Sequence, residues 1–135
     1  MMTLEEIKKE SLKLMFTNQD NEIDELDLEA LANDDNYGDY LVNMPGSINR
    51  AIVRLKSKGI EYTGDRITKD TSDDYVLPID EELSELIPYF VKGELYEEDN
   101  AQQAAIAKNY FEDTVDDYLA MKIEKTIEVV YEMDV

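Results

Sequence analysis

The fold is organised around the stretch PGSINRAIVRLKSKG, residues 45–59. Its apolar residues recur at the i, i+3, i+4 and i+7 spacing of a helix that buries one face, at Ile48, Ala51, Ile52 and Leu55. Pro45 either kinks a helix that already runs through residues 37–44 or lies in the first turn of a new one. Gly59 is suited to end the helix. We therefore predict a core helix through this stretch.

On the N-terminal side, the sequence indicates two further helices. Thr3-Leu4-Glu5-Glu6 has the pattern of a capping box, in which a threonine and a glutamate three residues later satisfy backbone N–H groups at a helix start. Apolar residues follow at helical spacing, so we predict an amphipathic helix over residues 4–16. A short helix over residues 26–32 is expected after an acidic linker.

On the C-terminal side, the pattern changes to one that is typical of strands. Residues 60–63 and 66–68 flank the turn residues Gly64-Asp65, and residues 75–77 are a third short apolar run. This arrangement predicts a β-hairpin insertion at about residues 60–77.

Two longer helices are expected next. The first begins at Asp80 and continues to about Leu95, with a kink at Pro88 because the apolar period continues past the proline. The second covers residues 101–120, and its alanines would let it approach a neighbouring helix closely.

The C-terminal residues have strand periodicity. Apolar and polar residues alternate there, with the apolar positions at Ile123, Ile127, Val129 and Tyr131. Such a strand would pair either with the 60–77 segment or with a neighbouring subunit. The sequence thus predicts a mainly α protein: a small helical bundle in one domain over residues 1–135, with a short β-hairpin insertion and a C-terminal β-strand.

Composition restricts the possible functions. The chain has 33 acidic and 13 basic residues and a formal net charge of -20, which disfavours binding to nucleic acid or anionic membranes. Hydrophobic residues make up 43%, which is typical of a globular protein. The N-terminus has no signal-peptide pattern, and no apolar run approaches the ~18 residues of a membrane span. We therefore expect a cytosolic protein.

Catalytic chemistry has few candidate residues. The absence of His and Cys removes the commonest general base, thiolate metal ligands and the standard catalytic triads. Alternating oxygen ligands occur at residues 20–24 and 70–74, but neither segment has the glycine and terminal glutamate of a calcium-binding EF-hand loop. We expect no enzymatic activity, no metal and no cofactor.

Charge is distributed unevenly along the chain. Residues 20–39 contain nine acids and no Lys or Arg, whereas residues 50–69 contain six Lys or Arg and only two acids. Opposite patches on one chain could join copies head to tail, and such contacts form a ring if the rotation closes. The alternative is that both are ordinary solvated faces. The candidate interface cations are Arg50, Arg54, Lys58 and Arg66.

The order of these segments resembles the head–tail connector (adaptor) proteins of tailed phages and Gram-positive prophages. The likeness lies in YLVNMPGSINRAIVRL (residues 40–55), LPIDEELSELIPYFVKGELY (77–96), an acidic turn, NYFE (109–112) and IEVVY (127–131). It covers roughly two thirds of the chain, and its motifs are packing patterns.

The resemblance implies a structural role without catalytic residues. Connectors form a ring between the portal protein and the tail or stopper proteins and extend the DNA channel, so the expected location is the virion head–tail junction, with assembly in the host cytoplasm. DNA would pass without sequence-specific binding. The four cations named above would contact a neighbouring subunit or the portal, and Ile127, Val129 and Tyr131 would reach across a subunit boundary.

Two other functions stay open. An acidic DNA mimic, or another protein-binding inhibitor, would use the negative charge to occupy a DNA-binding protein, although the basic band at residues 50–69 is unfavourable for this. A carboxylate or metal-dependent enzyme would need a deep pocket with clustered acids.

Overall fold

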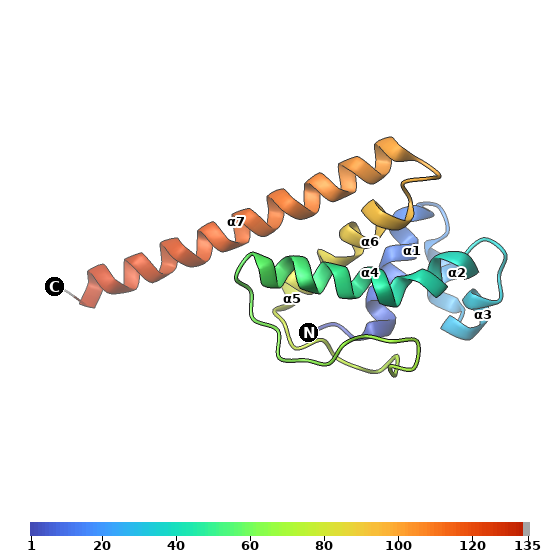
Figure 1. Ribbon diagram of the computed structural model, residues 1–135, viewed down its shortest axis with the longest axis horizontal. Helices are drawn as coiled ribbons and strands as arrows, with labels where there is room; N and C mark the ends of the chain where they lie inside the picture. The colour runs from blue at the N-terminus through green and yellow to red at the C-terminus, as the bar shows by residue number, and fades with distance from the viewer. Residues whose placement is uncertain (134–135) are drawn as a thin grey trace.

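The computed structural model describes the backbone of residues 1–133 and the side chains of residues 1–125 and Ile127. The described part of the chain is mainly helical (Figure 1). Its helices, in chain order, are α1 (Leu4–Met15), α2 (Asp20–Glu25), α3 (Leu28–Ala32), α4 (Gly38–Ser57), α5 (Glu81–Ser84), α6 (Ile87–Leu95) and α7 (Ala101–Met133).

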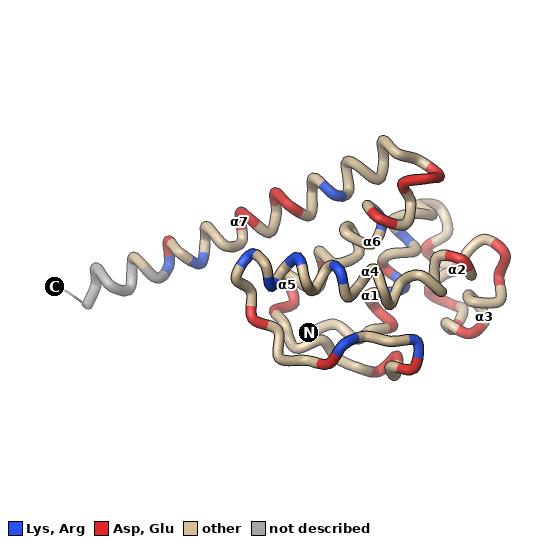
Figure 2. The backbone as a smooth tube through the Cα atoms, viewed as in Figure 1, with Lys and Arg blue, Asp and Glu red and all other residues tan. Residues whose placement is uncertain are grey.

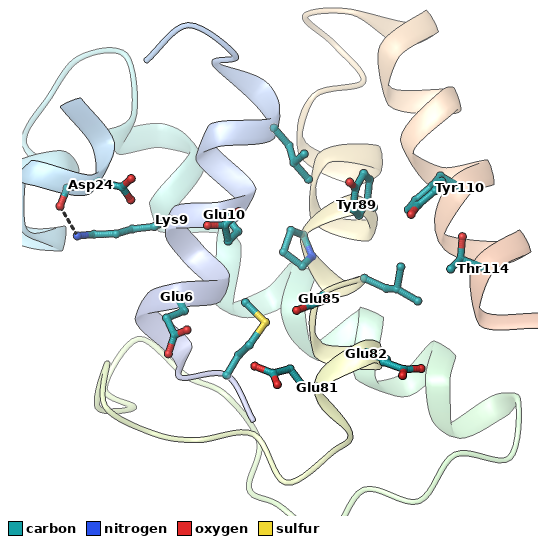
Figure 3. Close-up of a pocket in the computed structure, with 14 residues that line it drawn as sticks. Glu6, Lys9, Glu10, Asp24, Glu81, Glu82, Glu85, Tyr89, Tyr110 and Thr114 are labelled. Carbon is teal, nitrogen blue, oxygen red and sulfur yellow. Dashed lines mark hydrogen bonds between the residues drawn. The ribbon is translucent and has the colours of Figure 1, made fainter. Parts of the chain in front are cut away.

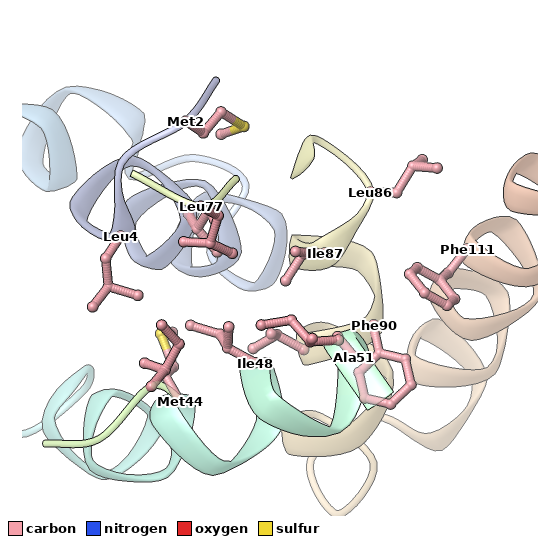
Figure 4. Close-up of a cluster of buried hydrophobic side chains, with 14 of the residues drawn as sticks. Met2, Leu4, Met44, Ile48, Ala51, Leu77, Leu86, Ile87, Phe90 and Phe111 are labelled. Carbon is pink, nitrogen blue, oxygen red and sulfur yellow. The ribbon is translucent and has the colours of Figure 1, made fainter. Parts of the chain in front are cut away.

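Helix α6 is the centre of the bundle. It packs against α1, α4 and α7, so helices that are distant in the sequence share one core. The core extends from the N-terminus, across α4 and α6, to the first half of α7 (Figure 4). Each large apolar side chain buried there stabilises the fold by about 1.5–3 kcal/mol relative to its exposure to water. The labelled members of this core are Met2, Leu4, Met44, Ile48, Ala51, Leu77, Leu86, Ile87, Phe90 and Phe111.

The predicted first helix and its cap are confirmed. The backbone N–H of Glu6 donates to Thr3 Oγ1 at 3.2 Å, and the backbone N–H of Thr3 donates to Glu6 Oε1 at 3.2 Å. This reciprocal pair satisfies two of the N–H groups that a helix start leaves without partners. Helix α3 similarly begins where the Asp27 side chain accepts a hydrogen bond from Ala30 N–H at 2.8 Å. The short helix α2 was not predicted.

The predicted core stripe of α4 is also confirmed. Ile48, Ala51, Ile52 and Leu55 are all buried. Pro45 lies inside a single helix rather than at the start of a new one. After the C-cap residue Lys58, the chain turns through Gly59, whose φ of 95° lies in the left-handed region that favours glycine.

The predicted β-hairpin at about residues 60–77 is wrong. Within the described residues this segment has no strand pair of its own, and Val76 forms only an isolated antiparallel bridge with Thr3. Its backbone groups find side-chain partners instead: Asn49 Nδ2 donates to Ile67 O at 2.5 Å, and Ile67 N–H donates to Asn49 Oδ1 at 2.9 Å. Because one asparagine occupies both backbone groups of Ile67, this residue has none left for a strand ladder.

The helix predicted from Asp80 to Leu95 is divided in two. Helix α5 ends at Ser84, and α6 begins at Ile87 with Pro88 in its first turn. Proline has no N–H to donate to the carbonyl four residues earlier, and its ring collides with that carbonyl inside a helix. The chain therefore breaks before Pro88 instead of bending at it.

The predicted C-terminal β-strand is wrong as well. Helix α7 continues through Ile123 and Ile127 to Met133, well beyond the predicted end at residue 120. The predicted alternation also contains an i, i+4 pair, Ile123 and Ile127, which suits a helix. A helix satisfies its own backbone groups, whereas a strand at this place would need an edge to pair with. Figure 1 shows the end of α7 leading away from the rest of the bundle.

Candidate interaction surfaces

The first part of the predicted basic band lies on α4 and its C-cap, and its cations Arg50, Arg54 and Lys58 pair with acids of the same chain. Arg50 Nε lies 2.9 Å from both carboxylate oxygens of Glu94 on α6. Arg54 forms a two-point contact with Glu112 on α7, with Nε–Oε1 at 2.7 Å and Nη2–Oε2 at 2.9 Å. Lys58 Nζ lies 2.8 Å from Glu112 Oε2 and 2.6 Å from Asp116 Oδ1. The band therefore joins α4 to α6 and α7.

These pairs bear directly on the predicted interface. Arg50, Arg54 and Lys58 already have carboxylate partners within the chain, so their contact with a neighbouring subunit or a portal stays a prediction. Arg66 is exposed in the segment between α4 and α5, away from this row of ion pairs. Of the three predicted C-terminal residues, Ile127 is exposed on α7, and the side chains of Val129 and Tyr131 lie outside the described residues.

The Arg54–Glu112 contact makes stability depend on pH. The hydrogen bond from Arg54, aided by Lys58, lowers the pKa of Glu112 from 4.5 to about 2 against the opposing effect of burial. A carboxyl with a lowered folded-state pKa stabilises the fold above its unfolded pKa, and this contribution is lost as the pH falls through the folded pKa. The difference in unfolding free energy between the wild type and Glu112→Gln should therefore be full above about pH 4.5 and vanish towards about pH 2.

Urea unfolding at a series of pH values measures this difference. The pKa difference sets an upper limit of about 3 kcal/mol on this plateau. Solvent screens the partly exposed pairs, which contribute about 0.2–1 kcal/mol each, so the expected plateau is lower, at about 1–2 kcal/mol. Asp113→Asn is the matched control, because Asp113 is an exposed neighbour on the same helix. A Glu112→Gln difference that is constant across the pH range would contradict the assignment.

The two halves of α7 have different surroundings. In the first half, the core-facing side chains are buried against the bundle: Ala104, Ala107, Phe111 and Val115. Among the side chains described beyond Leu119, Met121, Ile123 and Ile127 are exposed by 59%, 62% and 49%. Soluble monomers expose single apolar residues routinely, but a contiguous apolar surface marks a place of contact. The second half of α7 is a candidate contact element.

The predicted close approach of the alanine-rich helix is confirmed at one crossing. A Cβ placed on Gly93 of α6 would lie 3.1 Å from Lys108 Cβ and 3.4 Å from Ala104 O, both on α7. A glycine on one helix and an alanine on the other let the two backbones come together. This crossing is thus a point of close approach between the backbones of α6 and α7.

An open groove of about 710 Å³ lies on another side of the bundle, between α1, α5, α6 and α7 (Figure 3). Apolar and aromatic side chains from α1, α6, α7 and the N-terminus line it together with glutamates of α1 and α5. The groove was not predicted, because its walls come from segments that are far apart in the sequence. Its lining residues are Met2, Glu6, Lys9, Glu10, Leu14, Asp24, Glu81, Glu82, Glu85, Leu86, Pro88, Tyr89, Tyr110 and Thr114.

The region around α2 and α3 forms a further candidate surface, which is acidic. Acids of residues 20–39 lie on these short helices and their connections, at one end of the bundle (Figure 2). Lys13 from α1 reaches this region and pairs with Asp24 at 2.6 Å. Most of the acids there are exposed.

The described residues contain neither a metal-binding cluster nor a membrane-spanning helix. Within the described residues, no three acids lie together in a way that could hold a metal ion. None of the described helices combines the length and the hydrophobicity that crossing a membrane requires.

Comparisons with family models, curated proteins and solved structures give no match to this chain. The structure itself shows a small helical protein with many exposed acids and a C-terminal helix that extends beyond the bundle.

Proposed function

We propose that this chain is a structural assembly protein of the head–tail connector kind, which forms a ring between a portal protein and tail or stopper proteins. The observation that supports the proposal best is the second half of α7. This helical segment lies beyond the core, and its described large apolar side chains, Met121, Ile123 and Ile127, are exposed.

The exposed residues form a surface that suits helix docking. Ile123 and Ile127 are one helical turn apart, so their side chains lie on the same side of α7. A helix with such a stripe binds by laying it into an apolar groove of another protein. Burial of each isoleucine would contribute about 1.5–3 kcal/mol before the entropic cost of association is subtracted.

The charge of the chain suits a DNA channel. A net charge of -20 repels the phosphate backbone, which would let DNA pass without adhering to the wall. In this proposal the protein contacts DNA without reading its sequence. It assembles in the host cytoplasm and resides at the head–tail junction of the virion.

Imaging of portal-bearing particles tests the proposal. The protein is mixed with DNA-filled phage heads that carry portals but no tails, and electron microscopy should show added ring-shaped density at the portal vertex. The double variant Ile123→Glu/Ile127→Glu should give no such density, because charged side chains oppose burial of the stripe.

The control variant is Val53→Glu/Ile106→Glu. It introduces the same two charges at exposed apolar positions on α4 and on the first half of α7. The control should bind portals as the wild type does. Absence of density with the wild-type protein, or equal loss in both double variants, would argue against docking through the end of α7.

The acidic region of α2 and α3 supports a second candidate, an acidic DNA mimic or other protein-binding inhibitor. Residues 20–39 place nine acids and no Lys or Arg at one end of the bundle. A mimic would bind a DNA-processing enzyme tightly and would be displaced by duplex DNA. Such capture, together with a failure to bind portals, would favour this function over the connector.

A further inference from the structure

The groove between α1, α5, α6 and α7 has an apolar floor. This floor consists of the lining residues Met2, Leu86, Pro88 and Tyr89, of which Met2 and Leu86 are almost fully buried. Tyr110 of α7 stands at its side with 47% of its surface exposed.

An aromatic pair connects the floor of the groove, on α6, with its side on α7. The rings of Tyr89 and Tyr110 have centroids 4.4 Å apart and planes inclined by 46°. Burial, together with the neighbouring Tyr110 and Glu10, raises the pKa of Tyr89, so this phenol stays neutral at physiological pH. The pair offers a flat, uncharged surface for an apolar side chain.

The rim of the groove is acidic on two sides. Glu81, Glu82 and Glu85 lie along the α5 side, and Glu6 and Glu10 lie along the α1 side (Figure 3). All five are exposed.

Few cations of the chain neutralise this rim. Lys13 pairs with Glu10 at 3.2 Å, and Lys9 pairs with Glu5 and donates to the Asp24 carbonyl. Within the described part of the chain, Glu81, Glu82 and Glu85 have no ion pair. The α5 side therefore carries three carboxylates without an ion pair beside an apolar floor. Lys122 and Lys125 lie on the far side of Glu81 and Glu82, where they line a separate pocket with these two glutamates.

This combination selects a ligand that is both basic and apolar. Lys and Arg side chains can place their methylene stems on an apolar surface while their charged ends reach an acidic rim. A helix with apolar residues at i, i+3, i+4 and i+7 would set these on the floor. The negative field of the chain would also attract such a segment. We propose that the groove binds a basic amphipathic segment of a partner protein.

A labelled model peptide of Lys and Leu, with Leu at helical spacing, is the probe, and fluorescence anisotropy measures its binding. The triple variant Glu81→Gln/Glu82→Gln/Glu85→Gln should bind the peptide about tenfold more weakly, because it loses three exposed ion pairs. Tyr110→Ser should also weaken binding, and it should do so even at high salt, because it removes aromatic contact area at the side of the groove rather than charge.

A matched triple variant separates the groove from the general charge of the protein. Glu25→Gln/Glu29→Gln/Glu97→Gln removes the same number of charges from exposed positions elsewhere. It should leave the affinity within about twofold of the wild type. Equal weakening in both triples would show that the peptide senses net charge only, and equal binding of a Lys/Ser peptide would show that the floor has no role. Either result would overturn the proposal.

This site is independent of the docking proposed for the end of α7. The Ile123→Glu/Ile127→Glu variant leaves the groove intact and should bind the peptide normally. Conversely, the variant Glu81→Gln/Glu82→Gln/Glu85→Gln keeps the exposed isoleucines of α7. It should therefore still give ring-shaped density at the portal vertex. Circular dichroism and thermal unfolding of each variant exclude misfolding as the cause of any loss.

Discussion

Phe111→Ala is expected to lower the free energy of unfolding by about 3–5 kcal/mol. Phe111 is fully buried on α7, and its ring meets that of Phe90 on α6 edge-on, with centroids 5.2 Å apart (Figure 4). Alanine would remove this contact and leave a cavity at the junction of the two helices. Domains of this size have total stabilities of about 5–15 kcal/mol, so the loss is a large part of the whole.

Equilibrium unfolding in urea, followed by circular dichroism, measures the effect. Ile106→Ala is the control: it lies on the same helix and makes a comparable truncation, but Ile106 is 55% exposed. Its free energy of unfolding should change by less than about 0.5 kcal/mol. A similar loss in both variants would mean that α7 does not pack through Phe111.

The helices that the sequence predicts well are those with local signals. The capping box at Thr3 and Glu6 fixes the start of α1, and the stripe from Ile48 to Leu55 fixes the buried face of α4. Both signals act within one or two helical turns, so neighbouring residues suffice to recognise them.

The two strand predictions failed for a different reason. A strand forms only where another strand pairs with it. The residues near it in the sequence do not show whether such a partner strand exists. At Ile67 the partner is the side chain of Asn49, which takes both backbone groups. At Ile123 no strand edge is supplied, and the helix that began at Ala101 continues. Alternating apolar residues in a short segment are compatible with either outcome.

The candidate surfaces were predictable only in part. The row of cations on α4 follows from their spacing, but the acids that meet Arg50 and Arg54 lie 44 and 58 residues further along the chain. Tertiary packing alone decides which acids these are. The groove is a stronger case, because Glu6 and Glu82 come together only when α1 and α5 are both placed beside α6.

Gly93→Leu should lower the free energy of unfolding by about 1–3 kcal/mol, the range for overpacking a close contact. The Cβ alone would lie 3.1 Å from Lys108 Cβ and 3.4 Å from Ala104 O, and the remaining leucine atoms would have to extend into the space that α7 occupies. The higher helix propensity of leucine opposes the loss by only about 0.8–1 kcal/mol. Urea unfolding gives the net value.

Gly46→Leu separates the effect of the close α6–α7 contact from the effect of the higher helix propensity of leucine. Gly46 also lies inside a helix, α4, but there the nearest atom to an added Cβ is the Arg50 guanidinium at 3.3 Å, which is the end of a flexible side chain. This variant should therefore be neutral or stabilised by up to about 1 kcal/mol. A lower free energy of unfolding for Gly93→Leu, together with an unchanged or higher one for Gly46→Leu, would establish that the α6–α7 crossing requires glycine. If Gly93→Leu were also stabilised, α7 would have to be free to shift on α6.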